Sequence, residues 1–136
     1  MTKEKEREID RVWQAIVAMV MDTRGDWRRM VAAATGLPFT RVRALRRLAD
    51  GPLTLRALAE SLGTDAPAAT VAVNDLERRG LVTRCEHPDD RRAKLVSLTA
   101  AGRATLREGK SVPDRAPLSL AELSREDVKT LARIFR

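Results

Sequence analysis

The sequence is poor in cysteine, in aromatic residues and in long apolar runs, and each scarcity excludes something. Only one of the 136 residues is cysteine, which rules out an internal disulfide and a cysteine-clustered zinc site and fits the reducing cytoplasm. Aromatic residues make up 3% of the chain, whereas strand-rich folds favour them. No apolar run is long enough to cross a bilayer, and the charged start, residues 1–8, leads into no signal-type apolar stretch. We therefore expect a mainly helical cytoplasmic protein.

The chain is also poor in the groups that catalysis needs. It has one histidine, one cysteine and no glycine-rich phosphate loop, so no pair of nucleophile and base can be assigned. An enzyme is therefore only the third option for the function, and we expect no cofactor and no metal.

Positive charge, in contrast, is abundant. The 26 lysines and arginines outnumber the 19 aspartates and glutamates, which gives a formal net charge of +7. Such an excess attracts polyanions, because neutralised phosphates release their condensed counterions. Nucleic acid is therefore the leading partner, and the alternative is that the arginine-rich helices are simply solvated.

Residues 4–34 have the apolar periodicity of one long amphipathic helix, which Gly25 could interrupt. The apolar positions are Ile9, Trp13, Ile16, Val17, Val20, Trp27, Met30, Val31 and Ala34. This stripe is longer than one small domain needs, so we expect part of it to face a partner.

The middle of the chain predicts a helix-turn-helix. After a helix between Pro38 and Gly51, Thr54 can cap a short helix over residues 55–62, and Gly63 supplies a left-handed turn. Asp65 can cap the next helix, which stops at Gly80. Two helices joined by such a turn form a helix-turn-helix, although an ordinary helical hairpin is about as good a reading of these residues alone.

Two segments of strand character follow, residues 81–86 and 94–98, with a polar and basic stretch between them. They predict a β-hairpin with a basic tip, and a hairpin placed directly after a helix-turn-helix is a wing. Thr99 can then cap a helix over residues 100–111, where Gly102 would allow close packing, and Ser124 can cap a last helix.

In four segments, residues 53–60, 76–82, 90–92 and 96–102, the chain resembles the MarR family. The resemblance implies a mainly α fold with a small β-hairpin wing, in which residues 1–36 and 99–136 form dimerisation helices and residues 37–98 form a winged helix-turn-helix lobe that binds DNA. It also implies a homodimeric transcriptional regulator, with repression as the family expectation, that binds a palindromic site on double-stranded DNA. A winged-helix module that binds another protein instead of DNA is the alternative.

The resemblance assigns base reading to the N-terminal part of the second helix of the motif. Its outward residues would be Ala66, Pro67, Ala68, Thr70, Val71 and Asn74. These are short and mostly apolar, which fits contacts to thymine methyl groups, with Asn74 pairing with adenine, so we expect A·T-containing half-sites. Plain helix filling is the alternative for Ala68 and Val71.

In the wing, Arg91 and Arg92 would enter the minor groove, and Asp90 would brace Arg92 through a charge-assisted hydrogen bond. A solvated surface turn is the alternative. The arginines expected to contact phosphates are Arg78, Arg79 and Arg84, with Arg41, Arg43 and Arg56 as weaker candidates.

The family also suggests a small aromatic or phenolic effector, bound between the dimerisation helices and the DNA-binding lobe. The residues that could line such a pocket are Trp13, Trp27, Met30 and Phe39. At helical spacing, these residues are more often plain core.

Overall fold

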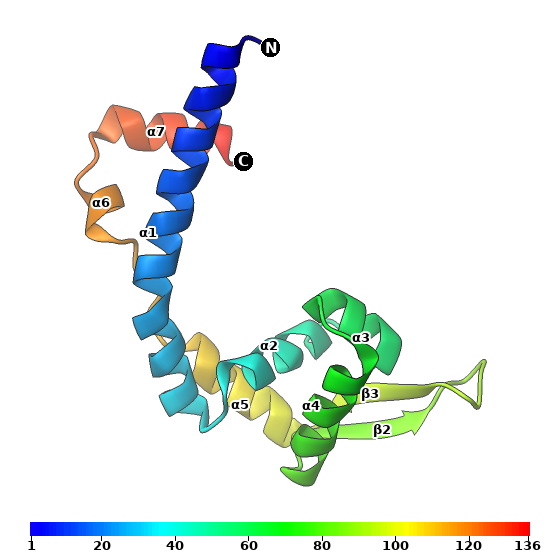
Figure 1. The fold of residues 1–136 in the computed structure, drawn as a ribbon. Helices are drawn as coiled ribbons and strands as arrows, with labels where there is room; N and C mark the ends of the chain where they lie inside the picture. The colour runs from blue at the N-terminus through cyan, green and yellow to red at the C-terminus, as the bar shows by residue number, and fades with distance from the viewer. The chain divides into compact units, whose positions relative to one another are not determined.

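The computed structural model describes residues 1–136, which form seven helices and three short strands (Figure 1). The helices are α1 (Lys3–Thr35), α2 (Phe39–Leu48), α3 (Leu55–Leu62), α4 (Ala66–Arg78), α5 (Ala100–Lys110), α6 (Leu118–Ala121) and α7 (Arg125–Ile134), and the strands are β1 (Leu53–Thr54), β2 (Val82–Glu86) and β3 (Lys94–Leu98). The chain divides into two compact units. One comprises Arg28–Val112, and the other comprises Met1–Trp27 together with Pro113–Arg136.

Helix α1 runs through Gly25 without a break. The single long helix predicted over residues 4–34 is confirmed, and the possible interruption is absent, because a glycine inside a helix costs only about 1 kcal/mol relative to alanine and the residues around it are compatible with a helix. Much of the apolar stripe toward the N-terminus of α1 is exposed in the chain, and Trp13 keeps 63% of its surface open to solvent.

The unit Arg28–Val112 contains the predicted helix-turn-helix, made by α3 and α4. The Thr54 side chain accepts a hydrogen bond from the backbone N–H of Ala57, and Gly63 ends α3 in the left-handed conformation with a φ of 65°. The Asp65 side chain then caps α4 by accepting from the backbone N–H of Ala68. All three local predictions are confirmed.

Helices α2, α3 and α4 bury their apolar faces together with the sheet. The buried side chains of these elements are Val42, Ala44, Leu45, Leu48, Leu58, Ala59, Ala69, Ala72, Val73, Leu76, Val82, Val96 and Leu98. This core fixes which face of α4 is left for a partner.

The three strands form one antiparallel sheet in the order β1, β3, β2. Strands β2 and β3 pair from Val82 opposite Leu98 to Glu86 opposite Lys94, and Figure 1 shows this hairpin projecting from the helices of its unit. The predicted wing is confirmed. Strand β1 was not expected, because two residues are too few to show an alternating pattern.

The start of α5 packs tightly against the beginning of the wing. Thr99 caps the helix by accepting from the backbone N–H of Gly102, and its hydroxyl donates to the Gly80 carbonyl at 2.6 Å. A Cβ atom on Gly102 would lie 2.0 Å from the carbonyl oxygen of Leu81. The close packing expected at Gly102 is therefore confirmed.

In the other unit, α7 begins as predicted at Ser124, whose side chain accepts from the backbone N–H of Asp127. The short helix α6 lies between the predicted elements and was not expected. No helix of the chain combines the length and the apolar character of a membrane span.

Candidate nucleic-acid interface

Helix α4 has one buried face and one open face. Ala69, Val73 and Leu76 point into the core, whereas Pro67, Ala68, Val71 and Asn74 are exposed on the other side. Val71, in the middle of this open face, is 60% exposed. The six residues predicted to read bases therefore lie on one helix, and most of them form its open face.

The polar groups on this face are few. The Thr70 hydroxyl donates its proton to the backbone carbonyl of Ala66 at 2.9 Å, so it offers only an acceptor and a methyl group. Among the six predicted residues, Asn74 alone has side-chain N–H groups to donate.

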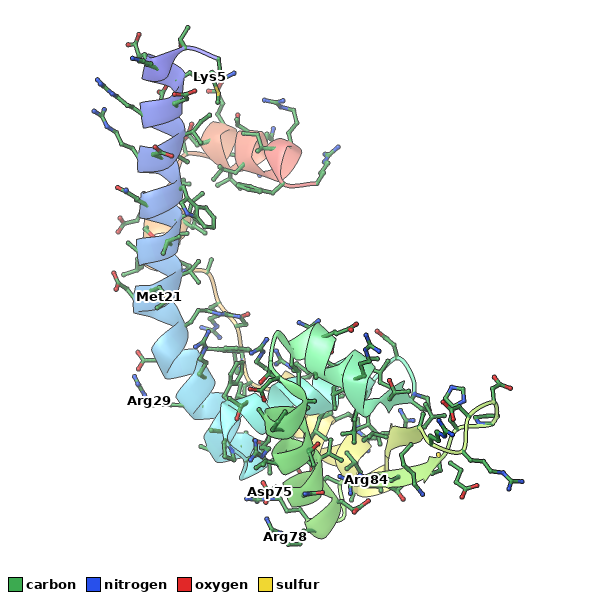
Figure 2. The ribbon with its side chains drawn as sticks, turned by 45° about the vertical axis from the view of Figure 1, so that its right-hand side comes forward. Lys5, Met21, Arg29, Asp75, Arg78 and Arg84 are labelled. Carbon is green, nitrogen blue, oxygen red and sulfur yellow. The ribbon has the colours of Figure 1, made fainter.

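Asp75 gathers three of the predicted phosphate-binding arginines around one carboxylate. Figure 2 labels Asp75 and one of these arginines, Arg78. Its oxygens accept from Arg78 Nη2 at 2.8 Å, from Arg41 Nε at 3.1 Å and from Arg79 Nε at 3.2 Å. The hydrogen bonds from the Arg78 and Arg41 side chains lower the pKa of the Asp75 carboxyl from 3.8 to about 2. Asp75 was not among the predicted site residues, although its spacing to Arg78 and Arg79 is that of helical ion pairs.

Arg84, on the wing strand β2, is bound to two side chains of α4. Its Nη2 donates to Asn74 Oδ1 at 2.6 Å, and its Nη1 lies 3.2 Å from Glu77 Oε1. Its Nε is buried without a hydrogen-bond partner. A side chain held in this way ties the wing to α4.

The remaining predicted phosphate contacts differ in their surroundings. Arg56 lies 3.5 Å from Glu60 one turn along α3, and both side chains are largely exposed. Such a pair contributes little and can open toward a phosphate. Arg43 is half-buried on α2 and forms no ion pair in the chain.

The positive charge at the wing tip is not neutralised by any ion pair. Arg91 and Arg92 are exposed, and neither forms an ion pair. Asp90 Oδ1 accepts from the backbone N–H of Arg92 at 2.9 Å, so the contact between these two residues involves the Arg92 backbone and not its guanidinium. The Arg92 guanidinium therefore stays available to a partner while the turn that carries it is held in shape.

Of the residues predicted to line an effector pocket, Trp13 and Trp27 belong to one compact unit, and Met30 and Phe39 belong to the other. Trp13 and Trp27 are fourteen residues apart on the continuous α1, a helical rise of about 21 Å. The Arg24 guanidinium lies 3.9 Å from the centre of the Trp27 ring, and those of Arg28 and Arg46 lie 5.2 Å and 5.9 Å from that of Phe39. Binding of an effector by these residues stays a prediction.

No group of three or more histidine, cysteine, aspartate and glutamate side chains is placed to hold a metal ion. What the unit Arg28–Val112 presents is an apolar helix face with one amide, next to a hairpin whose tip has two unpaired guanidinium groups.

The comparisons with known proteins agree with this geometry. A sequence model of the MarR family matches residues 35–93. The organic hydroperoxide resistance transcriptional regulator of Bacillus subtilis (strain 168) is 33% identical over 79 residues, which cover 58% of this chain and 53% of that protein. The match thus spans about half the length of this curated relative.

Solved structures match over nearly the whole chain. A probable transcriptional regulator from Pseudomonas aeruginosa is 32% identical, with 88% of this chain and 93% of that chain covered and a TM-score of 0.66. A MarR family transcriptional regulator from Streptomyces coelicolor, crystallised in complex with DNA, is 24% identical, with 100% and 89% covered and a TM-score of 0.70. The second likeness concerns the fold alone. The chain belongs to the MarR family of winged-helix transcriptional regulators, as its four sequence segments predicted.

Proposed function

We propose that this protein binds a palindromic site on double-stranded DNA as a homodimer and represses transcription there. The observation that carries the proposal is that the guanidinium groups of Arg91 and Arg92, at the tip of the hairpin that follows α4, form no ion pair. Arginine inserted in a minor groove is attracted by its negative potential, and a helix in the adjacent major groove can contact base edges. The Streptomyces coelicolor relative, crystallised with DNA, supports the same use of the fold.

The homodimer is supported by where the chain exposes apolar side chains. Of the large apolar residues that are exposed, all but Met30 and Val71 lie in the unit of Met1–Trp27 and Pro113–Arg136. Trp13 on α1 and Phe135 at the end of α7 are the largest, and Phe135 is 71% exposed. Apolar surface concentrated in this way marks an interface, and a two-fold dimer would present two copies of the DNA-binding unit to a palindrome.

The base preference follows from the open face of α4. Alanine, valine and the threonine methyl can contact thymine methyl groups, so we propose A·T-containing half-sites. Selection of bound sequences from a random pool tests this, and recovery of only G·C-rich half-sites would contradict it. Release by a small aromatic ligand stays a prediction, with no pocket assigned.

The wing is tested by changing Arg92 to alanine and measuring DNA affinity as a function of salt concentration. The variant loses one phosphate or groove contact, so its affinity falls and the slope of log affinity against log salt decreases by about one. Arg133→Ala is the matched control, because it removes the same charge from α7 and should leave the slope unchanged.

Two results would contradict the proposal at different levels. Wild-type affinity and slope in the Arg92 variant would remove the wing from the interface. A wild-type protein without any salt-dependent affinity for DNA would favour the protein-binding alternative for this fold.

A further inference from the structure

On the open face of α4, the amide of Asn74 is the one side-chain group that could present either a hydrogen-bond donor or an acceptor to a base. The other predicted reading residues offer methyl groups, or in Thr70 a hydroxyl whose proton is already bound within the helix. An asparagine amide has a donor end and an acceptor end, and a free side chain can present either of them to a base. What fixes the direction of this amide therefore bears on which bases the helix accepts.

Arg84 fixes it. A guanidinium group has only donors, so the atom of Asn74 that lies 2.6 Å from Arg84 Nη2 has to be the oxygen. The amide nitrogen is then directed away from Arg84, and both of its N–H groups are left for a partner. Arg84 comes from strand β2, opposite Val96 in the sheet, so the wing orients a side chain of α4.

Arg84 is itself held in place. Its second terminal nitrogen lies 3.2 Å from Glu77, one turn further along α4 than Asn74, so the planar fork spans two side chains of the helix. The same placement leaves Nε buried and without a partner. A buried N–H without a partner costs free energy, so an unbranched apolar side chain of similar length would suit folding at least as well.

We infer that Arg84 is a positioning residue for base readout: it holds Asn74 so that α4 presents a hydrogen-bond donor to the major groove. This inference rests on the proposed DNA-binding function. At the base that Asn74 meets, the donor is compatible with adenine, guanine or thymine, each of which has a major-groove acceptor, and it disfavours cytosine, which presents only a donor there. This role replaces the phosphate contact that the sequence predicted for Arg84.

The test compares variants by selection of bound sites from a random DNA pool, followed by affinity measurements on sites that differ at one position. For the wild type, we expect cytosine to be depleted at one position of each half-site, by roughly threefold to tenfold. Arg84→Met, which removes the donors and keeps the length, should abolish this depletion, with an unchanged salt slope and a melting temperature no lower than that of the wild type.

Asn74→Asp gives a second and independent readout. Aspartate can still accept from Arg84, so the fold and the tie between wing and helix are kept, but its free oxygen is an acceptor that suits the amino group of cytosine. The preference at that position should therefore turn toward cytosine. Arg78→Met is the control, because it removes an arginine held by Asp75 and should leave the preference at this position unchanged.

The outcomes separate the inference from the function on which it rests. If Arg84→Met keeps the cytosine depletion and lowers the salt slope by about one, Arg84 is a phosphate contact and the inference is overturned. Retention of the wild-type preference by Asn74→Asp would also overturn it. If the wild-type protein has no affinity for DNA, the proposed function itself fails.

Discussion

At the scale of single residues, the arginines differ in what binds them. Arg78, Arg79 and Arg41 surround Asp75, and Arg84 spans Asn74 and Glu77, whereas Arg91 and Arg92 have no ion pair. A count of positive charge therefore overstates the charge that is available to DNA near α4. At the wing tip the same count is accurate, because no ion pair neutralises the arginines there.

Asp75 makes a pH dependence testable. Its folded pKa of about 2 lies below the ordinary value of 3.8, so its carboxylate stabilises the fold at pH values above 3.8, and this contribution is lost as the pH falls toward 2. The variant Asp75→Asn lacks the group, so its free energy of unfolding should fall less between about pH 4 and about pH 2 than that of the wild type.

Urea unfolding at a series of pH values measures this difference. Asp50→Asn is a suitable control, because Asp50 is exposed and forms no ion pair, and its removal should leave the pH dependence near that of the wild type. Parallel pH profiles for wild type and Asp75→Asn would show that the three arginines do not depend on the carboxylate.

The sequence could predict some of these contacts and not others. Asp75 with Arg78 and Arg79 follows from positions three and four apart on a helix, which the sequence displays. Arg41 is 34 positions away from Asp75, and Arg84 is ten positions away from Asn74, across a turn. Such pairs depend on how α2 and β2 pack against α4, and no local pattern encodes that packing.

At the scale of elements, the sequence was most reliable where the helix ends carry their own signals. Thr54, Asp65, Thr99 and Ser124 each accept the backbone hydrogen bond that their positions predicted. The two elements that were not expected, β1 and α6, have two and four residues, which is too short for a periodic pattern. Gly25 left the continuity of the first helix open, because a glycine is compatible with a helix as well as with a break.

Gly102 tests the packing of α5 against the start of the wing. Alanine is the better helix former by about 1 kcal/mol, so propensity alone predicts that Gly102→Ala stabilises the protein. The added Cβ would lie 2.0 Å from a backbone oxygen of Leu81, which cannot rotate away as a side chain could. We therefore expect a loss of about 1 to 3 kcal/mol in unfolding free energy, measured by urea denaturation.

A glycine placed at Ala101 provides the reference for that measurement. Ala101 is exposed in the same turn, so Ala101→Gly reports helix propensity without a packing change and should cost about 1 kcal/mol. A Gly102→Ala variant as stable as the wild type would mean that α5 shifts easily against Leu81.

At the scale of the whole molecule, the sequence predicted that part of the α1 stripe faces a partner. The structure divides that stripe: Val31 is fully buried in its own unit, whereas Trp13 is largely exposed. Periodicity identifies the apolar side of a helix, but it does not say which turns of that side the same chain covers. The exposed turns are the ones that the proposed dimer would bury.

Replacing Trp13 with glutamate tests that dimer. Because Trp13 is already exposed in the single chain, the change should leave each unit folded, and glutamate keeps a good helix former in α1. In a two-fold dimer the residue is buried twice, and each burial of a large apolar side chain is worth about 1.5 to 3 kcal/mol, so the dissociation constant should rise at least about a hundredfold. Sedimentation equilibrium measures this dissociation constant.

The variant Val71→Asp is the control, because it places a charge on an exposed apolar position of α4 instead. It should impair DNA binding while self-association stays at the wild-type level. If Trp13→Glu associates as tightly as the wild type, the dimer does not bury this turn of α1; if Val71→Asp dissociates the dimer, the interface involves α4 and cannot leave that helix free for DNA.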